Sequence, residues 1–150
     1  MTKRTRPTFI ENAMAIAYQI ANRSEDPYKQ VGCVAIDSEG SYVSNGYNGA
    51  PPGVEINWED RDGRRKYVVH AELNALLRAP RHSINTLVCT MVPCTNCLIT
   101  CAAHGVKKII YDEFYSSETY GSVQDTEKMA KEVGIELERF PQKDKKAKSL

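Results

Sequence analysis

The chain has 150 residues, enough for one domain with a sizeable core, and its 41% hydrophobic and 26% charged residues are typical of globular proteins. The formal net charge of +1 excludes the strong overall field of many nucleic-acid-binding proteins. No apolar run is long enough to span a bilayer, and no apolar signal core follows the first residues. We therefore expect a cytoplasmic protein with no membrane contact, whose five cysteines are thiols or metal ligands.

The N-terminal third predicts a helix followed by a hairpin. Thr8 and Glu11 have the spacing of a capping box, and apolar residues then recur on one helical face. The apolar run 31–36, the turn residues 38–40 and the segment 41–47 predict two antiparallel strands.

A long segment, 48–69, shows no clear period and carries several Gly and Pro residues. Loops of this length inside compact domains usually form lids or binding loops.

The rest of the chain alternates between helical and strand patterns. Because a strand, a helix and a strand follow one another closely after residue 86, we expect a right-handed parallel crossover. The predicted elements are a helix over 70–79, a strand over 86–92, a helix over 94–104, a strand over 107–111, a helix over roughly 119–133 and a strand over 135–140. Together they predict an α/β fold, a three-layer α/β/α sandwich with a mixed five-stranded sheet. Residues 1–150 are expected to form a single domain with a tail from about 142.

The chemistry of the chain depends on two cysteines, Cys94 and Cys97, that open a predicted helix. Such a pair can be half of a zinc ribbon, a thioredoxin-like redox pair, or two ligands of a catalytic metal. A ribbon needs a second pair at similar spacing, and the sequence contains only one. The redox interpretation leaves His70 and Glu72 without a role.

His70 completes a set of three ligands with Cys94 and Cys97, which leaves one coordination position open, as in catalytic zinc sites. The N-terminus of a helix stabilises the thiolate form that zinc requires. Glu72 lies two residues after His70 and points elsewhere on the helix, which suits a proton carrier and not a ligand. His-x-Glu followed by Pro-Cys-x-x-Cys is the known signature of zinc-dependent deaminases, and His70–Glu72 and Pro93–Cys97 match it.

Four stretches make the chain resemble the deoxycytidylate (dCMP) deaminase family, within the cytidine deaminase-like superfamily. They are SEDPYKQVG (24–32), GYNGAPPG (46–53), HAELNAL (70–76) and VPCTNC (92–97). The resemblance implies hydrolytic deamination of dCMP to dUMP and ammonia, which feeds thymidylate synthesis. It also implies catalytic Zn²⁺ on His70, Cys94 and Cys97, with Glu72 as the catalytic acid and base.

The same resemblance implies the substrate contacts. The backbone amide of Ala71 would hold the base oxygen, Asn48 would bond the sugar, and Ser24 and Tyr115 would lie near the sugar-phosphate. Arg23 and Lys29 are cations that could bind the phosphate. Their spacing does not decide between this role and that of a solvated loop charge. The resemblance further implies a homohexamer that is activated by dCTP with Mg²⁺ and inhibited by dTTP.

Other interpretations stay open at this point. The enzyme could accept dCTP as well as dCMP, or could deaminate adenosine or cytidine in nucleic acid, although the net charge disfavours a stable nucleic-acid partner. A zinc-stabilised module without catalysis is a further possibility, which Glu72 argues against. Residues 49–69 contain no Cys or His, so no second structural zinc is expected there. Cys33, Cys89 and Cys101 are interpreted as buried thiols.

Overall fold

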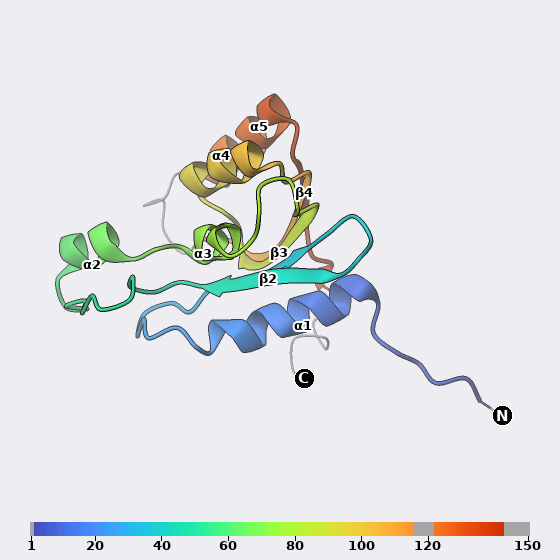
Figure 1. The fold of residues 1–150 in the computed structure, drawn as a ribbon, viewed down its shortest axis with the longest axis horizontal. Helices are drawn as coiled ribbons and strands as arrows, with labels where there is room; N and C mark the ends of the chain where they lie inside the picture. The colour runs from blue at the N-terminus through green and yellow to red at the C-terminus, as the bar shows by residue number, and fades with distance from the viewer. Residues whose placement is uncertain (1, 116–121, 143–150) are drawn as a thin grey trace.

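The computed structural model describes residues 2–115 and 122–142 (Figure 1). They form one mixed sheet with the strand order β2-β1-β3-β4-β5. β1 is antiparallel to β2 and β3, while β3, β4 and β5 run parallel. The strands are β1 (Gly32–Ile36), β2 (Tyr42–Tyr47), β3 (Thr86–Met91), β4 (Lys108–Glu113) and β5 (Glu136–Arg139). The predicted mixed sheet of five strands and its parallel crossover are confirmed.

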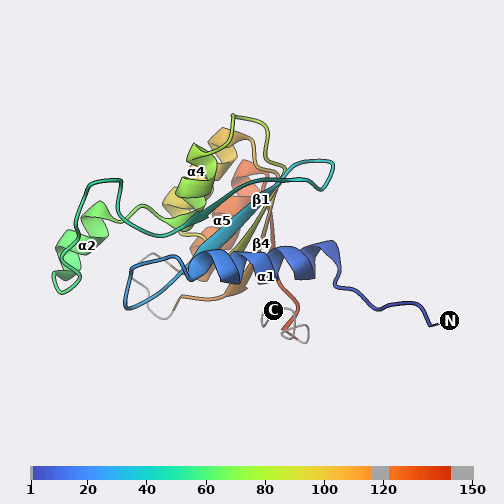
Figure 2. The same cartoon turned by 60° about the horizontal axis from the view of Figure 1, so that its bottom comes forward.

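Helices cover the two faces of the sheet, as Figures 1 and 2 show. α1 lies on one face, and α3, α4 and α5 pack on the other. α2 projects to one side, away from the sheet. The helices are α1 (Phe9–Ala21), α2 (Arg61–Tyr67), α3 (Ala71–Leu77), α4 (Thr95–His104) and α5 (Val123–Val133). The predicted three-layer α/β/α sandwich is therefore confirmed.

The start of α1 follows from its sequence. The Thr8 amide donates to Glu11 Oε1 at 2.7 Å and the Glu11 amide donates to Thr8 Oγ1 at 3.1 Å, so the predicted capping box is present. The apolar face of α1 is buried against β1 and β3. A Cβ on Gly32 would lie 1.9 Å from the Ala17 carbonyl oxygen, so only glycine permits this close packing of β1 against α1.

The segment 48–69 differs from the prediction because it contains a helix, α2. The Asp60 side chain caps it by accepting a hydrogen bond from the Gly63 amide at 3.1 Å. None of the α2 residues is buried. A helix without a buried face needs no apolar stripe, and this is why hydrophobic periodicity missed it.

The base of this segment is closed by a two-bond bridge between Gly49 and Val69, at 3.1 Å and 2.8 Å. The last helix, α5, begins at Val123 with Ser122 as its cap. Residues 119–121 of the longer predicted helix, and 143–150 of the predicted tail, lie outside the described residues. Among the described residues, no helix is long and apolar enough to cross a membrane.

Candidate metal centre and active site

Two helix N-termini bring three predicted ligands together on the sheet face that α3 and α4 cover. His70 is the residue immediately before α3, Cys94 is the residue immediately before α4, and Cys97 lies in the first turn of α4. His70 Nδ1 lies 3.5 Å from Cys94 Sγ and 3.3 Å from Cys97 Sγ. The three atoms lie within 4.8 Å of one another and form a group that could hold a metal ion.

These distances fit zinc. Tetrahedral zinc with ordinary Zn–S and Zn–N bonds would separate a ligand nitrogen from a ligand sulfur by about 3.5 Å. One nitrogen and two thiol sulfurs are also the donors that zinc prefers. A set of three protein ligands leaves a fourth position open for a water molecule or a substrate, as in catalytic sites and unlike closed structural ones.

The two thiols have opposite pKa shifts. A hydrogen bond from the Cys97 thiol is the main cause that lowers the pKa of Cys94 to about 4, against the opposing effect of burial. The same hydrogen bond is the main cause that raises the pKa of Cys97. The Cys97 amide also donates to Cys94 Sγ at 3.4 Å, so the start of α4 supports negative charge on this atom. A bound zinc ion would require both sulfurs as thiolates, so its binding would release thiol protons.

Glu72 lies in the first turn of α3, is buried, and falls outside the set of ligand atoms. Burial raises the pKa of its carboxyl group, although the nearby His70 opposes this effect. A carboxyl group with a raised pKa can both accept and return a proton near neutral pH. The site therefore combines a metal-binding group with a separate candidate for proton transfer.

A cavity opens beside this group, and most of the predicted substrate contacts line it. Ala71, Glu72 and Cys94 line it, together with His70. Asn48 and Tyr115 also line the cavity, whereas Ser24 and Cys97 are not among its lining residues. The remaining lining residues are Lys29, Val31, Val68, Met91 and Val92.

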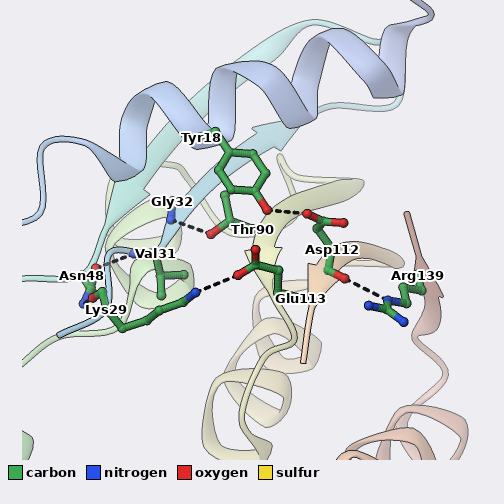
Figure 3. Close-up of polar contacts among 9 residues, drawn as sticks. All are labelled: Tyr18, Lys29, Val31, Gly32, Asn48, Thr90, Asp112, Glu113 and Arg139. Atoms are coloured by element: carbon green, nitrogen blue, oxygen red, sulfur yellow. Dashed lines mark hydrogen bonds and ion pairs between the residues drawn. The ribbon is translucent and has the colours of Figure 1, made fainter. Parts of the chain in front are cut away.

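Asn48 holds the loop that precedes β1. Its Oδ1 accepts from the Val31 amide at 2.8 Å (Figure 3). Its Nδ2 donates to the Lys29 carbonyl at 2.9 Å and to Asp26 Oδ2 at 3.3 Å. The Ser24 hydroxyl donates to the Asn48 carbonyl at 2.8 Å. These contacts join residues 24–32 to residues 46–53 in the fold.

Several cavity residues were missed or left undecided by sequence reasoning. Lys29 lines the cavity, whereas the guanidinium of the other candidate cation, Arg23, lies over the Tyr47 ring at 5.9 Å. No spacing rule distinguishes the two, because the hydrogen bonds of Asn48 decide where Lys29 lies. Met91 could have been predicted as a cavity residue, because it is the last residue of the strand that precedes Cys94.

The remaining cysteines are buried thiols, as predicted. Cys33 and Cys89 face each other on β1 and β3 with their sulfurs 3.2 Å apart, and Cys101 is also fully buried. Burial raises the pKa of Cys33 and of Cys101, and the pKa of Cys89 is raised first by its hydrogen bond with Cys33 and then by burial.

The α/β/α fold and the His/Cys/Cys group with a nearby buried carboxylate define the class of zinc-dependent deaminases. Residues 7–113 match the family described as the cytidine and deoxycytidylate deaminase zinc-binding region. The chain belongs to this family, which confirms the predicted resemblance and the predicted catalytic zinc.

Relatives and solved structures agree with this assignment. The chain is similar to the deoxycytidylate deaminase of Mus musculus, with 33% identity over 147 residues that cover 89% of this chain and 80% of the mouse protein. It is 37% identical to a probable deoxycytidylate deaminase of Caenorhabditis elegans over 67% of this chain, which spans 55% of the worm protein. The crystal structure of the dCMP deaminase from cyanophage S-TIM5 in complex with dCMP and dUMP superposes with a TM-score of 0.75 at 30% identity, covering 91% of this chain and 100% of that chain.

Proposed function

We propose that the protein catalyses the hydrolytic deamination of dCMP to dUMP and ammonia, and so supplies the precursor of thymidylate. The observation that carries this proposal is the buried Glu72 carboxyl group beside the three-ligand group, in a cavity open to a small molecule. The names of the mouse and worm relatives and the dCMP and dUMP bound to the cyanophage enzyme support the choice of substrate.

In the proposed site, His70, Cys94 and Cys97 hold zinc. When bound in such a site, zinc lowers the pKa of a water molecule toward about 7 and makes it a nucleophile at neutral pH. Glu72 would take one proton from the attacking water and deliver it to N3 of the cytosine ring as the water oxygen bonds to C4. It would then take the second proton from that oxygen and pass it to the amino group, so that the C4–N4 bond breaks and ammonia leaves. Its burial supports this role, because a raised pKa keeps the group able to hold a proton between these steps.

The proposed substrate contacts surround this centre. The backbone amide of Ala71, at the start of α3, receives the base oxygen. Asn48 and Tyr115 contact the sugar and the sugar-phosphate from the cavity wall. Ser24 acts through the Asn48 carbonyl, with which its hydroxyl is hydrogen-bonded.

A substrate panel tests the proposal. The zinc-loaded protein is incubated with dCMP, dCTP, cytidine and dAMP, and ammonia release is followed. We expect dCMP to be turned over with the highest kcat/KM. The proposal is overturned if zinc-loaded protein turns over no cytosine nucleotide.

We also propose that the protein acts in the cytoplasm as a homo-oligomer, with dCTP and Mg²⁺ as activator and dTTP as inhibitor. An apolar groove between α3 and α4 supports an interface between copies, since it is lined by Leu73, Leu77 and Ala103 and the Leu77 side chain is 78% exposed. Light scattering after gel filtration measures the mass of the particle, and repeating the substrate panel with dCTP or dTTP present tests the effectors. A monomeric particle would contradict the proposed oligomer. Rates unchanged by either nucleotide would contradict the proposed regulation.

A further inference from the structure

Lys29 is the one Lys or Arg side chain among the described residues that line the cavity. Its Nζ lies 2.7 Å from Glu113 Oε2, and the two side chains are 49% and 44% exposed (Figure 3). A cation and an anion are therefore paired at the rim of the site, where neither is committed to the protein core.

Hydrogen bonds hold the backbones of Lys29 and Glu113 in place, whereas their side chains are half-exposed. The Lys29 carbonyl accepts from Asn48 Nδ2 at 2.9 Å, and its amide donates to Asp26 Oδ1 at 3.3 Å. Glu113 pairs with Met91 in the sheet, and its carbonyl accepts from the Val92 amide at 2.9 Å. Because Met91 and Val92 line the cavity, the pair is anchored on two sides of the same opening.

Nearby cations are engaged elsewhere. The Arg23 guanidinium lies over the Tyr47 ring, and the Arg64 guanidinium lies 4.1 Å from the centre of the Tyr28 ring and bonds the Trp58 carbonyl at 3.0 Å. Neither of these arginines lines the cavity. Lys29 is thus the described cation best placed to meet an anionic group of a ligand that lies in the cavity.

The strengths of the two contacts favour an exchange of partner. An exposed Lys–Glu pair contributes little to stability, whereas a hydrogen bond between an ammonium group and a phosphate is short and charge-assisted. When Lys29 turns to a phosphate, the Glu113 carboxylate stays at the rim. It then repels any additional negative charge that extends beyond the first phosphate.

We propose that Lys29 and Glu113 together determine which 5′ substituent of the substrate is accepted. Lys29 binds the first phosphate, and Glu113 disfavours a second and a third phosphate by electrostatic repulsion. The proposal rests on the proposed deamination of a deoxycytidine nucleotide, and it gives that site a preference for monophosphates over triphosphates.

Lys29→Met tests the attractive half. We expect kcat/KM for dCMP to fall about 10- to 100-fold, while kcat/KM for deoxycytidine changes less than about 3-fold. Calorimetric titration with dUMP and deoxyuridine gives the same comparison if deoxycytidine turnover is too slow to measure. Lys108→Met is the matched control, because Lys108 lies at the other end of β4 and pairs with Glu138 at 3.0 Å.

Glu113→Gln tests the repulsive half. We expect the ratio of kcat/KM for dCTP to that for dCMP to rise about 5- to 10-fold, or, if dCTP turnover is too slow to measure, the ratio of the Kd for dUTP to that for dUMP to fall by a similar factor in calorimetric titration. An unchanged ratio in both measurements would remove Glu113 from the proposal.

The two levels of failure are distinguishable. If the unaltered protein deaminates dCMP but Lys29→Met weakens dCMP and deoxycytidine equally, or weakens neither, the role of Lys29 is wrong and the proposed function stands. The role of Lys29 is also wrong if Lys108→Met changes the two rates as much as Lys29→Met does. If the unaltered zinc-loaded protein deaminates no cytosine nucleotide, both proposals fall.

Discussion

Glu72 is the residue that separates a catalytic zinc site from a structural one. Its proposed role as proton carrier predicts that Glu72→Gln lowers kcat by about 10²- to 10⁴-fold. Zinc content should stay near that of the unaltered protein, because Glu72 lies outside the three ligand atoms. Elemental analysis of the purified variant measures it, alongside ammonia release from dCMP. Loss of zinc together with activity would mean that Glu72 is a ligand.

Tyr18 and Asp112 form a polar contact on the opposite face of the sheet. The Tyr18 hydroxyl donates to Asp112 Oδ2, and Gln142 Nε2 donates to Asp112 Oδ1 at 3.0 Å. Asp112 is completely buried, so loss of the Tyr18 donor leaves a buried carboxyl oxygen with one hydrogen bond fewer. Burial, and then the hydrogen bond to Asp112, raise the pKa of Tyr18.

Tyr18→Phe is therefore expected to lower the free energy of unfolding by about 1–3 kcal/mol without changing kcat. Urea denaturation and the dCMP assay measure the two quantities. Tyr67→Phe is the control, since this tyrosine is half-exposed and its loss of a hydroxyl should change stability by less than about 0.5 kcal/mol. Equal effects of the two substitutions would contradict the assigned importance of the Asp112 contact.

At the scale of elements, α3 is held unusually close to β2. A Cβ on Gly46 would lie 2.4 Å from the Ala71 carbonyl oxygen and 2.5 Å from the Ala75 amide nitrogen. Asn74 also connects α3 to β2, because its Nδ2 donates to the Tyr47 carbonyl at 2.8 Å. Since His70 and Glu72 belong to the start of α3, the packing of this helix sets their positions.

Gly46→Ala should therefore displace α3, lower the free energy of unfolding by about 1–3 kcal/mol or more and reduce both zinc content and turnover. Gly49→Ala is a matched control in the same sequence stretch, because its added Cβ would meet only the Tyr47 ring, at 3.7 Å. Thermal unfolding and elemental analysis compare the pair. A Gly46→Ala protein with ordinary stability and zinc would show that α3 does not depend on this contact.

The elements that the sequence predicts are those whose signal is local or periodic. α1 has its cap and apolar face, and α4 has its cysteines and the terminal Gly105, which adopts a positive φ of 106°. α2 has neither a buried face nor a period. The ligand set could be predicted because it consists of fixed spacings, whereas the place of Lys29 depends on hydrogen bonds from Asn48 across the fold.

On the scale of the whole molecule, the metal-binding group adds a further connection between α3 and α4, which also pack on each other in the core. His70 precedes α3, while Cys94 and Cys97 belong to the start of α4. Bound zinc should therefore stabilise the folded state relative to the unfolded one. A metal present at about 1,000 times its Kd stabilises by about 4 kcal/mol.

Removal of zinc with a chelator is expected to lower Tm by about 8–16 °C, because each kcal/mol shifts Tm by roughly 2–4 °C in a chain of this size. Calorimetry with and without added zinc measures the shift, and re-addition should restore it. His70→Ala should have a low Tm that the chelator no longer changes. A chelator-insensitive Tm in the unaltered, zinc-loaded protein would exclude this stabilising role.

The bridge between Gly49 and Val69 has a consequence for how this chain can change. The two bonded residues adjoin Asn48 and His70, so the bridge joins the two ends of residues 50–68 at the edge of the site. Doubling the length of such a flexible excursion costs only about 0.6 kcal/mol in closure entropy. The length of the segment that includes α2 can therefore change at little cost in closure entropy, as long as Val68 keeps its place in the cavity wall.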